Sequence, residues 1–204
     1  MSVRKYSAIV FDLGNVLLPF DYTKTIKRMN SLEPGLGDNF YEFYNKNYHI
    51  HRDFEKGKIS EADFIKIMLS VVDNKLDAET FCDYYSDIFS LNKNVISLLP
   101  DLKKNYKLFL LSNTDSIHKR YRWEKYDFLK FFDHIILSFE VGAVKPEKSI
   151  YRSVEKVSAF PSGEHFYIDD IQEYVDAAKE LGWDAVRFEN YERLNADLEE
   201  REII

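Results

Sequence analysis

The sequence predicts an α/β fold in which a doubly wound parallel sheet carries an inserted helical segment. Short, largely apolar runs recur along the chain, as expected of strands that are covered on both faces. Segments with the apolar spacing of helices separate these runs, and such alternation indicates parallel strands joined by helices. One long stretch, residues 19–90, contains no convincing buried strand. A helical insertion is therefore expected between the first strand and the rest of the sheet.

Five runs are predicted to form the strands of the sheet. Each is short and rich in apolar or aromatic residues, which is the composition of a strand buried on both faces. They are YSAIVF (6–11), YKLFLLSN (106–113), HIILSF (134–139), HFYIDD (165–170) and DAVRF (184–188).

Helices are predicted between the strands from the spacing of apolar residues. In SIYRSVEKV, Ile150, Val154 and Val157 recur at i, i+4 and i+7. EYVDAAKELGW contains Gly182 near its end, where glycine is a plausible helix stop. NVISLLPDLKKN precedes the second strand, and its Pro100 is expected to start or kink a turn.

The insertion also carries a helix signal. Ser60 followed by Asp63 resembles a helix-start box, and the apolar residues after it share one helical face. These residues are Phe64, Ile67, Met68 and Val71. The chain is thus predicted to consist of a core, residues 1–18 and 91–204, and a helical insertion, residues 19–90.

Length, composition and charge exclude several classes of protein. The 204 residues suit one domain with an insertion, and 45% hydrophobic with 31% charged residues is an ordinary soluble balance. A net charge of −7 without a long basic run argues against nucleic-acid and anionic-membrane partners. The single cysteine, Cys82, gives no disulfide framework and fits a reducing compartment. No signal peptide or membrane span is recognisable, so a cytoplasmic location is expected.

Polar residues that can carry chemistry stand at or after four predicted strand ends. In sheets of this class, ligands bind beyond the carboxyl ends of the strands. Taken singly, each residue also has a structural reading: a cap for an aspartate, a turn for a Ser-Asn-Thr stretch, a solvated side chain for a lysine. The candidates are Asp12, Ser112-Asn113-Thr114, Lys145 and Asp169-Asp170.

As a set, these residues suit phosphoryl transfer. Three carboxylates offer the hard oxygen ligands that Mg²⁺ prefers. Lys145 is a compact charge for a phosphate or for a carboxylate that must stay ionised. The hydroxyl of Ser112 and nearby backbone N–H groups can hold phosphate oxygens. Positioning and charge neutralisation supply most of the catalysis in phosphoryl transfer, and a carboxylate nucleophile can form an aspartyl-phosphate.

Four segments, in this order, resemble the haloacid dehalogenase-like (HAD) superfamily and, within it, phosphatases with a helical cap. They are IVFDLGNVL, LFLLSNT, GAVKPEKSIY and FYIDDIQEYVDAAKELGW. VKPEKSIY and YIDDI also look like the phosphatase domain of soluble epoxide hydrolase, and FDLGNV with LSNT…H looks like bacterial sugar-phosphate phosphatases of the glucose-1-phosphate type. The resemblance implies a Rossmannoid core, a cap over residues 19–90, and Mg²⁺-dependent hydrolysis of a sugar phosphate or similar metabolite.

The resemblance also implies a role for each matching residue. Asp12 would attack phosphorus and form the aspartyl-phosphate. Ser112, with the backbone of Asn113, would bind the transferring phosphoryl group. Lys145 would pair with both Asp12 and the phosphate.

A Mg²⁺ site is implied at the same place. Asp12 and Asp170 would be metal ligands, and Asp169 would be either a ligand or a supporting group behind the ligands. The backbone carbonyl of Gly14 would supply a further contact, which needs no side chain.

Gly14 is also the main departure from the family pattern, because most phosphatases of the superfamily carry a second aspartate there. That aspartate protonates the leaving oxygen, and losing such an acid typically costs roughly 100- to 10,000-fold in rate. Three readings follow: another residue, with Asp21 or His118 as candidates, or a water takes over; the substrate has a good leaving group, such as an anomeric phosphate; or the protein is a noncatalytic phosphate-ligand or protein-binding module. An active but slow enzyme is the favoured reading.

Two other branches of the superfamily fit less well. The halide-displacing branch needs no Mg²⁺, which would leave the Asp169-Asp170 pair unexplained. The mutase branch normally retains the second aspartate that Gly14 replaces. Tyr174 stands where many relatives have asparagine, and its ring is expected to pack rather than react.

Within the cap, HRDFEKGKISEADF resembles the segment that faces the site. His51, Arg52 and Glu55 are candidate substrate contacts, although a charged helix end beside a glycine turn is often only solvated. His118 and Asp21 complete the candidates. Closure of a cap excludes water and completes a pocket, so a small phosphorylated metabolite is a more fitting substrate than a phosphoprotein. The oligomeric state is not indicated by the sequence.

Overall fold

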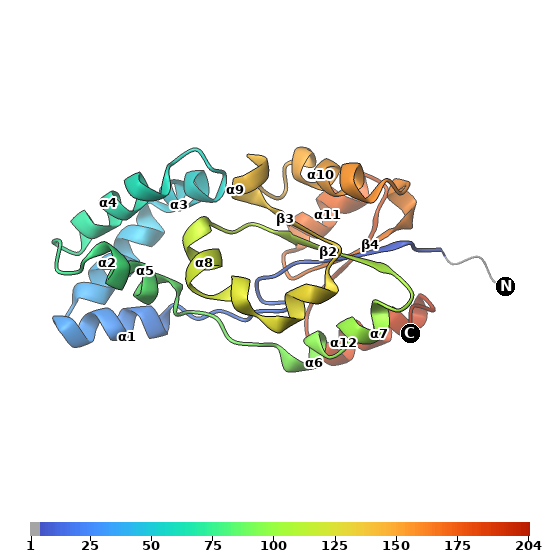
Figure 1. Ribbon diagram of the computed structural model, residues 1–204, viewed down its shortest axis with the longest axis horizontal. Helices are drawn as coiled ribbons and strands as arrows, with labels where there is room; N and C mark the ends of the chain where they lie inside the picture. Colours follow the sequence, from blue (N-terminus) through green and yellow to red (C-terminus); the bar gives the residue numbers. More distant parts are fainter. Residues whose placement is uncertain (1–4) are drawn as a thin grey trace.

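Five parallel strands form the sheet that the sequence predicts, in the order β3–β2–β1–β4–β5 (Figure 1). The structure is a computed structural model that describes residues 5–204, so residues 1–4 of the predicted core lie outside the described residues. The strands are β1 (Ala8–Phe11), β2 (Lys107–Ser112), β3 (His134–Leu137), β4 (His165–Asp169) and β5 (Asp184–Arg187). β1 lies at the centre, with Ile9 opposite Leu108 on one side and Phe166 on the other.

Helices cover both faces of the sheet, as a doubly wound fold requires. On one face, Ala8 and Val10 of β1 join an apolar cluster with Ile150 and Val175 from the covering helices. These helices are α10 (Lys148–Ser158) and α11 (Gln172–Glu180). The other face is covered by α6 (Lys93–Ile96), α7 (Leu99–Leu102), α12 (Tyr191–Glu200) and the short 3₁₀ helices η1 (Trp123–Lys125) and η2 (Asp127–Phe131).

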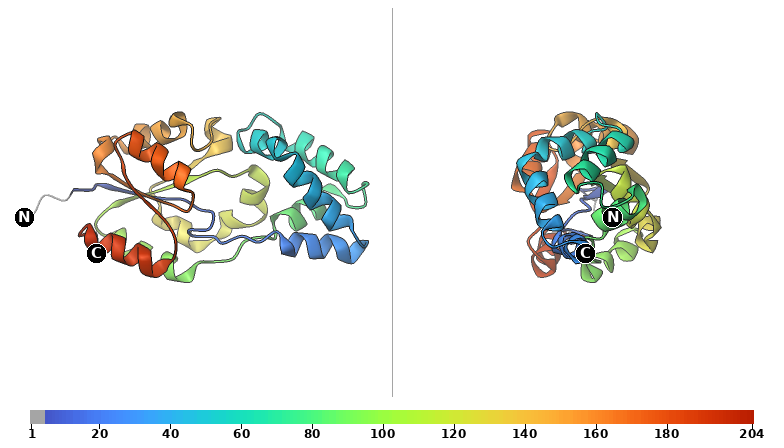
Figure 2. Two further views of the ribbon diagram at one scale, coloured as in Figure 1. Left: turned by 180° about the vertical axis from the view of Figure 1, so that it is seen from behind. Right: turned by 90° about the vertical axis from the view of Figure 1, so that its left-hand side faces the viewer.

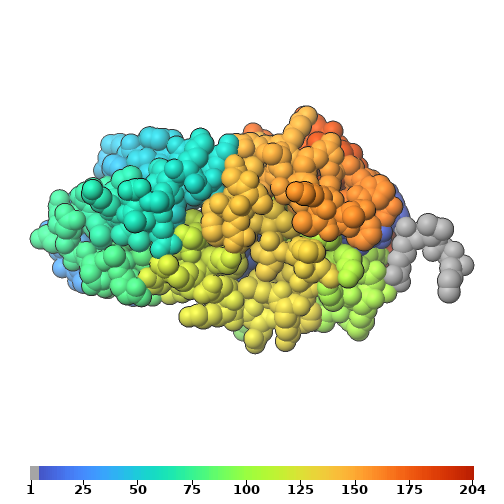
Figure 3. Space-filling model, turned by 45° about the horizontal axis from the view of Figure 1, so that its top comes forward, coloured from blue at the N-terminus to red at the C-terminus, as the bar shows by residue number. Residues whose placement is uncertain are grey.

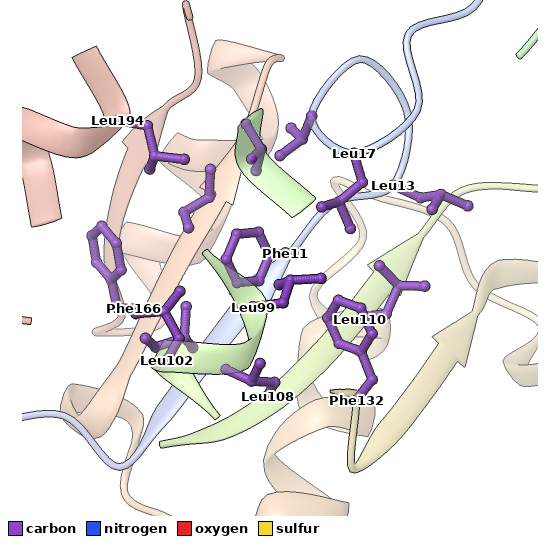
Figure 4. Packing of buried hydrophobic residues seen from close by; sticks show 14 of the residues in the cluster. Phe11, Leu13, Leu17, Leu99, Leu102, Leu108, Leu110, Phe132, Phe166 and Leu194 are labelled. Carbon is purple, nitrogen blue, oxygen red and sulfur yellow. The ribbon is translucent and has the colours of Figure 1, made fainter. Parts of the chain in front are cut away.

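A second apolar cluster lies on this other face of the sheet. Because successive strand residues point to opposite faces, Ile9 and Phe11 lie in this cluster and not in the first. Figure 4 shows Phe11 among Leu110 of β2, Leu99 of α7 and Leu194 of α12. Successive residues of β1 are thus buried on opposite faces of the sheet, which explains why the strand is apolar throughout.

Residues 19–90, between β1 and α6, form five helices at one end of the sheet (Figure 2). They enclose an apolar core of their own that includes Phe40, Phe64, Phe81 and Tyr85. All five lie within residues 19–90, and the exact division between core and cap remains a prediction. The helices are α1 (Thr23–Leu32), α2 (Leu36–Lys46), α3 (Tyr48–Glu55), α4 (Glu61–Val71) and α5 (Ala78–Ser86).

Local signals in the sequence account for several helix ends. The Ser60 hydroxyl accepts the N–H of Asp63 at 3.1 Å, which confirms the helix-start box of α4. Pro100 lies in the first turn of α7 and separates it from α6, so the predicted helix is split into two short ones. None of the helices in residues 5–204 is long and apolar enough to cross a membrane.

A glycine allows the end of α3 to lie against the core. A Cβ atom on Gly57 would be 2.7 Å from the carbonyl oxygen of Phe139, and Gly57 has a φ of +72°. Larger residues are therefore excluded at this contact. Phe139 belongs to the short helix α9 (Ser138–Val141), and Figure 3 shows the α3–α4 region abutting the α9 region.

Candidate active site

The cavity that holds most of the predicted site residues lies between the carboxyl ends of the strands and the helices of the insertion. Its volume is about 290 Å³. The core contributes Asp12 after β1, Ser112 at the end of β2, and Asp170 after β4. The insertion contributes residues of α2 and α3. Parallel strands end on the same edge, which is why segments far apart in the sequence meet here.

Lys145 is the centre of the charged groups in this site. Its side chain is 1% exposed, and its ammonium lies 2.6 Å from Asp12 Oδ1 and 2.6 Å from Asp169 Oδ2. The ammonium also donates to the carbonyl of Leu111 at 3.3 Å. The predicted pairing of Lys145 with Asp12 is thus present in the geometry.

The Asn113 side chain holds the backbone of Lys145. Its carbonyl oxygen accepts the N–H of Lys145 at 2.8 Å, and its amide nitrogen donates to the carbonyl of Lys145 at 3.2 Å. The guanidinium of Arg52 donates to the same carbonyl. The sequence indicated only the backbone of Asn113 as a phosphate contact, because this side-chain role depends on a residue far along the chain.

Asp12, Asp169 and Asp170 bring one carboxylate oxygen each to within 4.8 Å of the others. When all three carboxylates are ionised, the single ammonium of Lys145 leaves an excess of two negative charges. An all-oxygen donor set with this excess fits a hard divalent cation such as Mg²⁺.

The two adjacent aspartates have different surroundings. Asp169 does not line the cavity; its Oδ1 accepts the N–H of Ile171 at 2.9 Å, and its Oδ2 accepts from Lys145 and from the Tyr167 hydroxyl. Asp170 lines the cavity and accepts from the Asn15 amide at 2.9 Å. Asp170 is therefore the better placed to ligate a metal, and Asp169 to hold Lys145.

Burial and mutual repulsion oppose the ionisation of these carboxylates. Burial, together with the charge of Asp169, raises the pKa of Asp12 to about 8, although the Lys145 ammonium opposes the rise. Burial likewise raises the pKa of Asp170. Burial would lower the pKa of Lys145, but Asp12 and Asp169 outweigh it and raise the value, so the lysine stays charged. A divalent cation would relieve the repulsion between the carboxylates.

Phe20 lies beside the place where the side chain of a second aspartate would begin. A Cβ atom on Gly14 would be 3.3 Å from the Phe20 ring. The carbonyl of Gly14, the expected metal contact, accepts the N–H of Val16 at 2.6 Å, which leaves its second lone pair available.

Of the two candidate replacements for the missing acid, Asp21 is not brought to the cavity. Its exposed carboxylate accepts the N–H and the hydroxyl of Thr23 at 2.8 and 2.6 Å, at the start of α1. The structure thus places Asp21 outside the cavity lining, away from the other candidate substrate contacts. His118 lines the cavity, but its ring stacks on Tyr85 with centroids 4.3 Å apart. Burial lowers the pKa of His118 to about 4, so its ring is neutral at neutral pH and is not the imidazolium that would serve as a general acid.

The insertion contributes more to the cavity than the sequence indicated. His51, Arg52 and Glu55 line it as expected, and Arg52 donates to Glu55 at 3.1 Å. Beside them stands an aromatic wall, which was not predicted as part of the site. It consists of Phe20, Tyr22, Tyr41, Tyr44 and Tyr48. The three tyrosines at 41, 44 and 48 have helical spacing, and that spacing was the signal available in the sequence.

Tyr174 also belongs to the cavity lining. Its hydroxyl accepts from Arg52 at 3.2 Å and from the Asn113 amide at 3.4 Å. The Lys145 ammonium lies 5.1 Å from the centre of its ring. Tyr174 thus connects the insertion to the charged centre, a role beyond the packing expected from its ring.

Comparison with known proteins identifies the family to which the chain is similar. The family model described as haloacid dehalogenase-like hydrolase matches residues 36–188. D-ribitol-5-phosphate phosphatase of Bacteroides thetaiotaomicron is 25% identical over 189 residues, which cover 89% of this chain and 91% of the relative. Pyrimidine 5'-nucleotidase YjjG of Escherichia coli is 26% identical over 156 residues, 72% of this chain and 69% of the relative.

The fold is shared with solved structures. A crystal structure of a HAD family enzyme from Bacteroides thetaiotaomicron, in complex with magnesium and inorganic phosphate, matches with a TM-score of 0.80 and 24% identity. The match covers 93% of this chain and 98% of that chain. With the family model spanning most of the sequence, the chain belongs to the haloacid dehalogenase-like hydrolases.

Proposed function

We propose that this hydrolase is a Mg²⁺-dependent phosphatase that forms an aspartyl-phosphate on Asp12. The observation that carries the proposal is the buried Lys145 ammonium, shared at 2.6 Å between Asp12 and Asp169 next to Asp170. Phosphoryl transfer through a covalent intermediate needs a carboxylate nucleophile and a cation held in place beside it. It also needs enough negative charge nearby to bind a metal ion. The names of the phosphatase and nucleotidase relatives support the same reaction class.

Each residue has a role that follows from its position. The Asp12 carboxylate attacks phosphorus, and the ester oxygen leaves as an alkoxide that takes a proton from water. A second water then attacks the phosphorus of the aspartyl-phosphate, which releases phosphate and restores the Asp12 carboxylate. The Ser112 hydroxyl and the backbone N–H groups after it bind the phosphoryl oxygens, while Lys145 neutralises charge on Asp12 and on the phosphate. Mg²⁺, held by Asp12, Asp170 and the carbonyl of Gly14, would neutralise the remaining charge.

The substrate class is a small phosphate monoester such as a sugar phosphate. A cavity of about 290 Å³ lies at the small end of ligand sites. Its walls combine tyrosine rings and hydroxyls with Arg52 and Glu55, a mixture suited to a short chain or ring bearing hydroxyl groups. We further propose that residues 19–90 act as a cap that closes over this substrate and excludes water.

A noncatalytic phosphate-binding or protein-binding module is the second candidate. The packing of Phe20 beside Gly14 favours it, because no acid stands at that position to protonate a leaving group. Thermal stabilisation by phosphorylated ligands without their turnover would support this alternative.

The proposed function is tested by phosphate release. The purified protein with Mg²⁺ should release phosphate from p-nitrophenyl phosphate and from members of a sugar-phosphate panel. Asp12→Asn keeps the shape of the side chain but removes the nucleophile, so the rate should fall by at least about 1,000-fold. Asp21→Asn, which alters an exposed carboxylate outside the cavity, is the matched control. No release from any ester, or an undiminished rate in Asp12→Asn, would refute the proposal.

A further inference from the structure

Two helices bring a second group of metal-ligating side chains together beside the cavity. His51 comes from α3, whereas Asp115 and His118 come from the start of α8 (Ser116–Tyr121). One ligand atom of each residue lies within 4.8 Å of the other two. The residues are only 5%, 0% and 5% exposed, respectively. None of them has a role in the proposed phosphoryl transfer.

The separations in this cluster differ from those of hydrogen bonds. Nε2 of His51 lies 3.7 Å from Oδ2 of Asp115, and Nε2 of His118 lies 3.5 Å from the same oxygen. Hydrogen bonds between nitrogen and oxygen span about 2.7–3.2 Å. Zinc bonds of about 2.0–2.2 Å at tetrahedral angles place neighbouring ligand atoms roughly 3.3–3.6 Å apart. The observed values are thus closer to shared coordination than to direct hydrogen bonding.

The imidazoles also have unused coordination capacity. Within residues 5–204, both ring nitrogens of His51 and Nδ1 of His118 are buried without a hydrogen-bond partner. Buried polar atoms are rarely left unpaired, so the unpaired Nε2 of His51, which faces Oδ2 of Asp115, points to a ligand between the two.

Surrounding contacts hold the candidate ligands in place. Oδ1 of Asp115 accepts the N–H groups of Ile117 and His118 at 2.9 and 2.8 Å, which fixes the carboxylate at the start of α8. Oδ2 accepts from the Tyr85 hydroxyl at 3.0 Å, and the Tyr85 ring stacks on His118. Such outer contacts orient metal ligands in known sites.

We propose that His51, Asp115 and His118 form a second metal site, suited to Zn²⁺ and distinct from the carboxylate cluster around Asp12. Two imidazoles and one carboxylate suit zinc, whereas magnesium prefers oxygen ligands. Because the ligands come from α3 and α8, the ion links the insertion to the segment that follows β2. The two imidazoles line the cavity, so an ion between them also narrows the space for a substrate.

Zinc stoichiometry tests the site directly. The Asp170→Asn variant weakens the carboxylate cluster, and after dialysis against Zn²⁺ it should retain one zinc by mass spectrometry of metals. Adding His51→Gln or His118→Gln should lower zinc affinity by more than the roughly 10- to 100-fold that loss of an outer contact costs. Adding His49→Gln, an exposed histidine of the same helix, is the matched control and should keep the zinc.

Cobalt provides a readout that needs no variant of the proposed ligands. Co²⁺ bound to Asp170→Asn should give the strong visible absorption of a four-coordinate site with nitrogen ligands. Zinc retained equally by the His51, His118 and His49 variants, or the weak spectrum of a six-coordinate cobalt ion, would overturn the proposal. Circular dichroism in EDTA shows whether each variant is folded. Because the two histidines lie on different helices, the test can be made with either variant if the other does not fold. Metal binding is measured without a phosphate ester, so the result is independent of the proposed phosphatase activity.

Discussion

Gly14 and Phe20 together decide which leaving groups the candidate site can expel. Position 14 carries no acid, and the Phe20 ring lies 3.3 Å from the place where a side chain would start. A leaving oxygen must then depart without a proton from this position. Esters with acidic leaving groups are therefore expected to react far faster than alkyl phosphates.

Restoring the acid tests this explanation. Gly14→Asp combined with Phe20→Leu should raise the hydrolysis of an alkyl phosphate by at least about tenfold, because a positioned acid typically contributes 100- to 10,000-fold. The hydrolysis of p-nitrophenyl phosphate should change little, since its leaving group needs no proton. Initial rates with both esters give the measurement. Gly14→Asn with Phe20→Leu has the same size without the acid, and an equal gain in that variant would contradict the explanation.

Candidate site residues that follow the end of a strand could be predicted from the sequence. Asp12, Lys145 and Asp170 could be found in this way, because parallel strands share an edge. The role of the Asn113 side chain could not, since its partner is the backbone of Lys145, 32 residues away. The position of Asp21 outside the cavity depends instead on a short-range contact, because its carboxylate accepts the N–H of Thr23 at 2.8 Å.

Among the secondary-structure elements, Asp133 ties the start of β3 to its neighbours. It accepts from the backbone N–H of Leu108 at 2.9 Å, from Lys107 at 3.0 Å, and from Lys103 after α7. Burial would raise its pKa, but these three donors outweigh it and lower the pKa to about 2. The carboxylate therefore stabilises the fold in its ionised form.

The pH dependence of this contribution has a definite sign. A pKa lowered from the usual value of about 3.9 means stabilisation that is present above about pH 4 and lost as the pH falls toward 2. Asp133→Asn should lower the free energy of unfolding at pH 7 by about 1–2 kcal/mol, a figure reduced for the exposure of the lysines. Urea unfolding at pH 7 and pH 3 gives the comparison. A deficit that is equally large at both values would exclude the ionic explanation.

The periodicity of apolar residues predicted the type of most elements. It predicted their ends less well where a side-chain contact stops the element. The run 134–139 reads as one strand, yet β3 ends at Leu137. Ser138 turns away because its hydroxyl donates to the carbonyl of Thr114 and accepts the N–H of Thr114, both at 3.0 Å. This contact between distant segments leaves no trace in the local pattern.

In the molecule as a whole, Arg52 connects the insertion to the core. It donates to Glu55 within α3, and across the cavity to the carbonyl of Lys145 and the hydroxyl of Tyr174. The position of α3 over the strand ends could not be predicted from the sequence, because it depends on these contacts between segments far apart along the chain. These contacts join α3 to the core beside the cavity.

Replacing Arg52 should weaken the contact between α3 and the core. Arg52→Lys keeps the charge but cannot make the forked contacts, so KM for a small phosphate ester should rise by about tenfold or more, with a smaller fall in kcat. Hydrogen exchange of the backbone of α3 should become faster. Lys58→Met, which removes an exposed ion pair with Asp53 just after α3, is the control and should change neither quantity. Unchanged KM and unchanged exchange in Arg52→Lys would show that the contacts do not hold α3.

The central position of β1 has a consequence for how the chain folds during translation. The neighbours of Ala8 in the sheet are Lys107 and His165, so the first strand leaves the ribosome long before either partner exists. Helices α1 to α5, whose contacts are mostly close in sequence, can form in the meantime. The apolar strand β1 therefore stays unpaired until most of the polypeptide has emerged. Chaperones would be most needed during this interval.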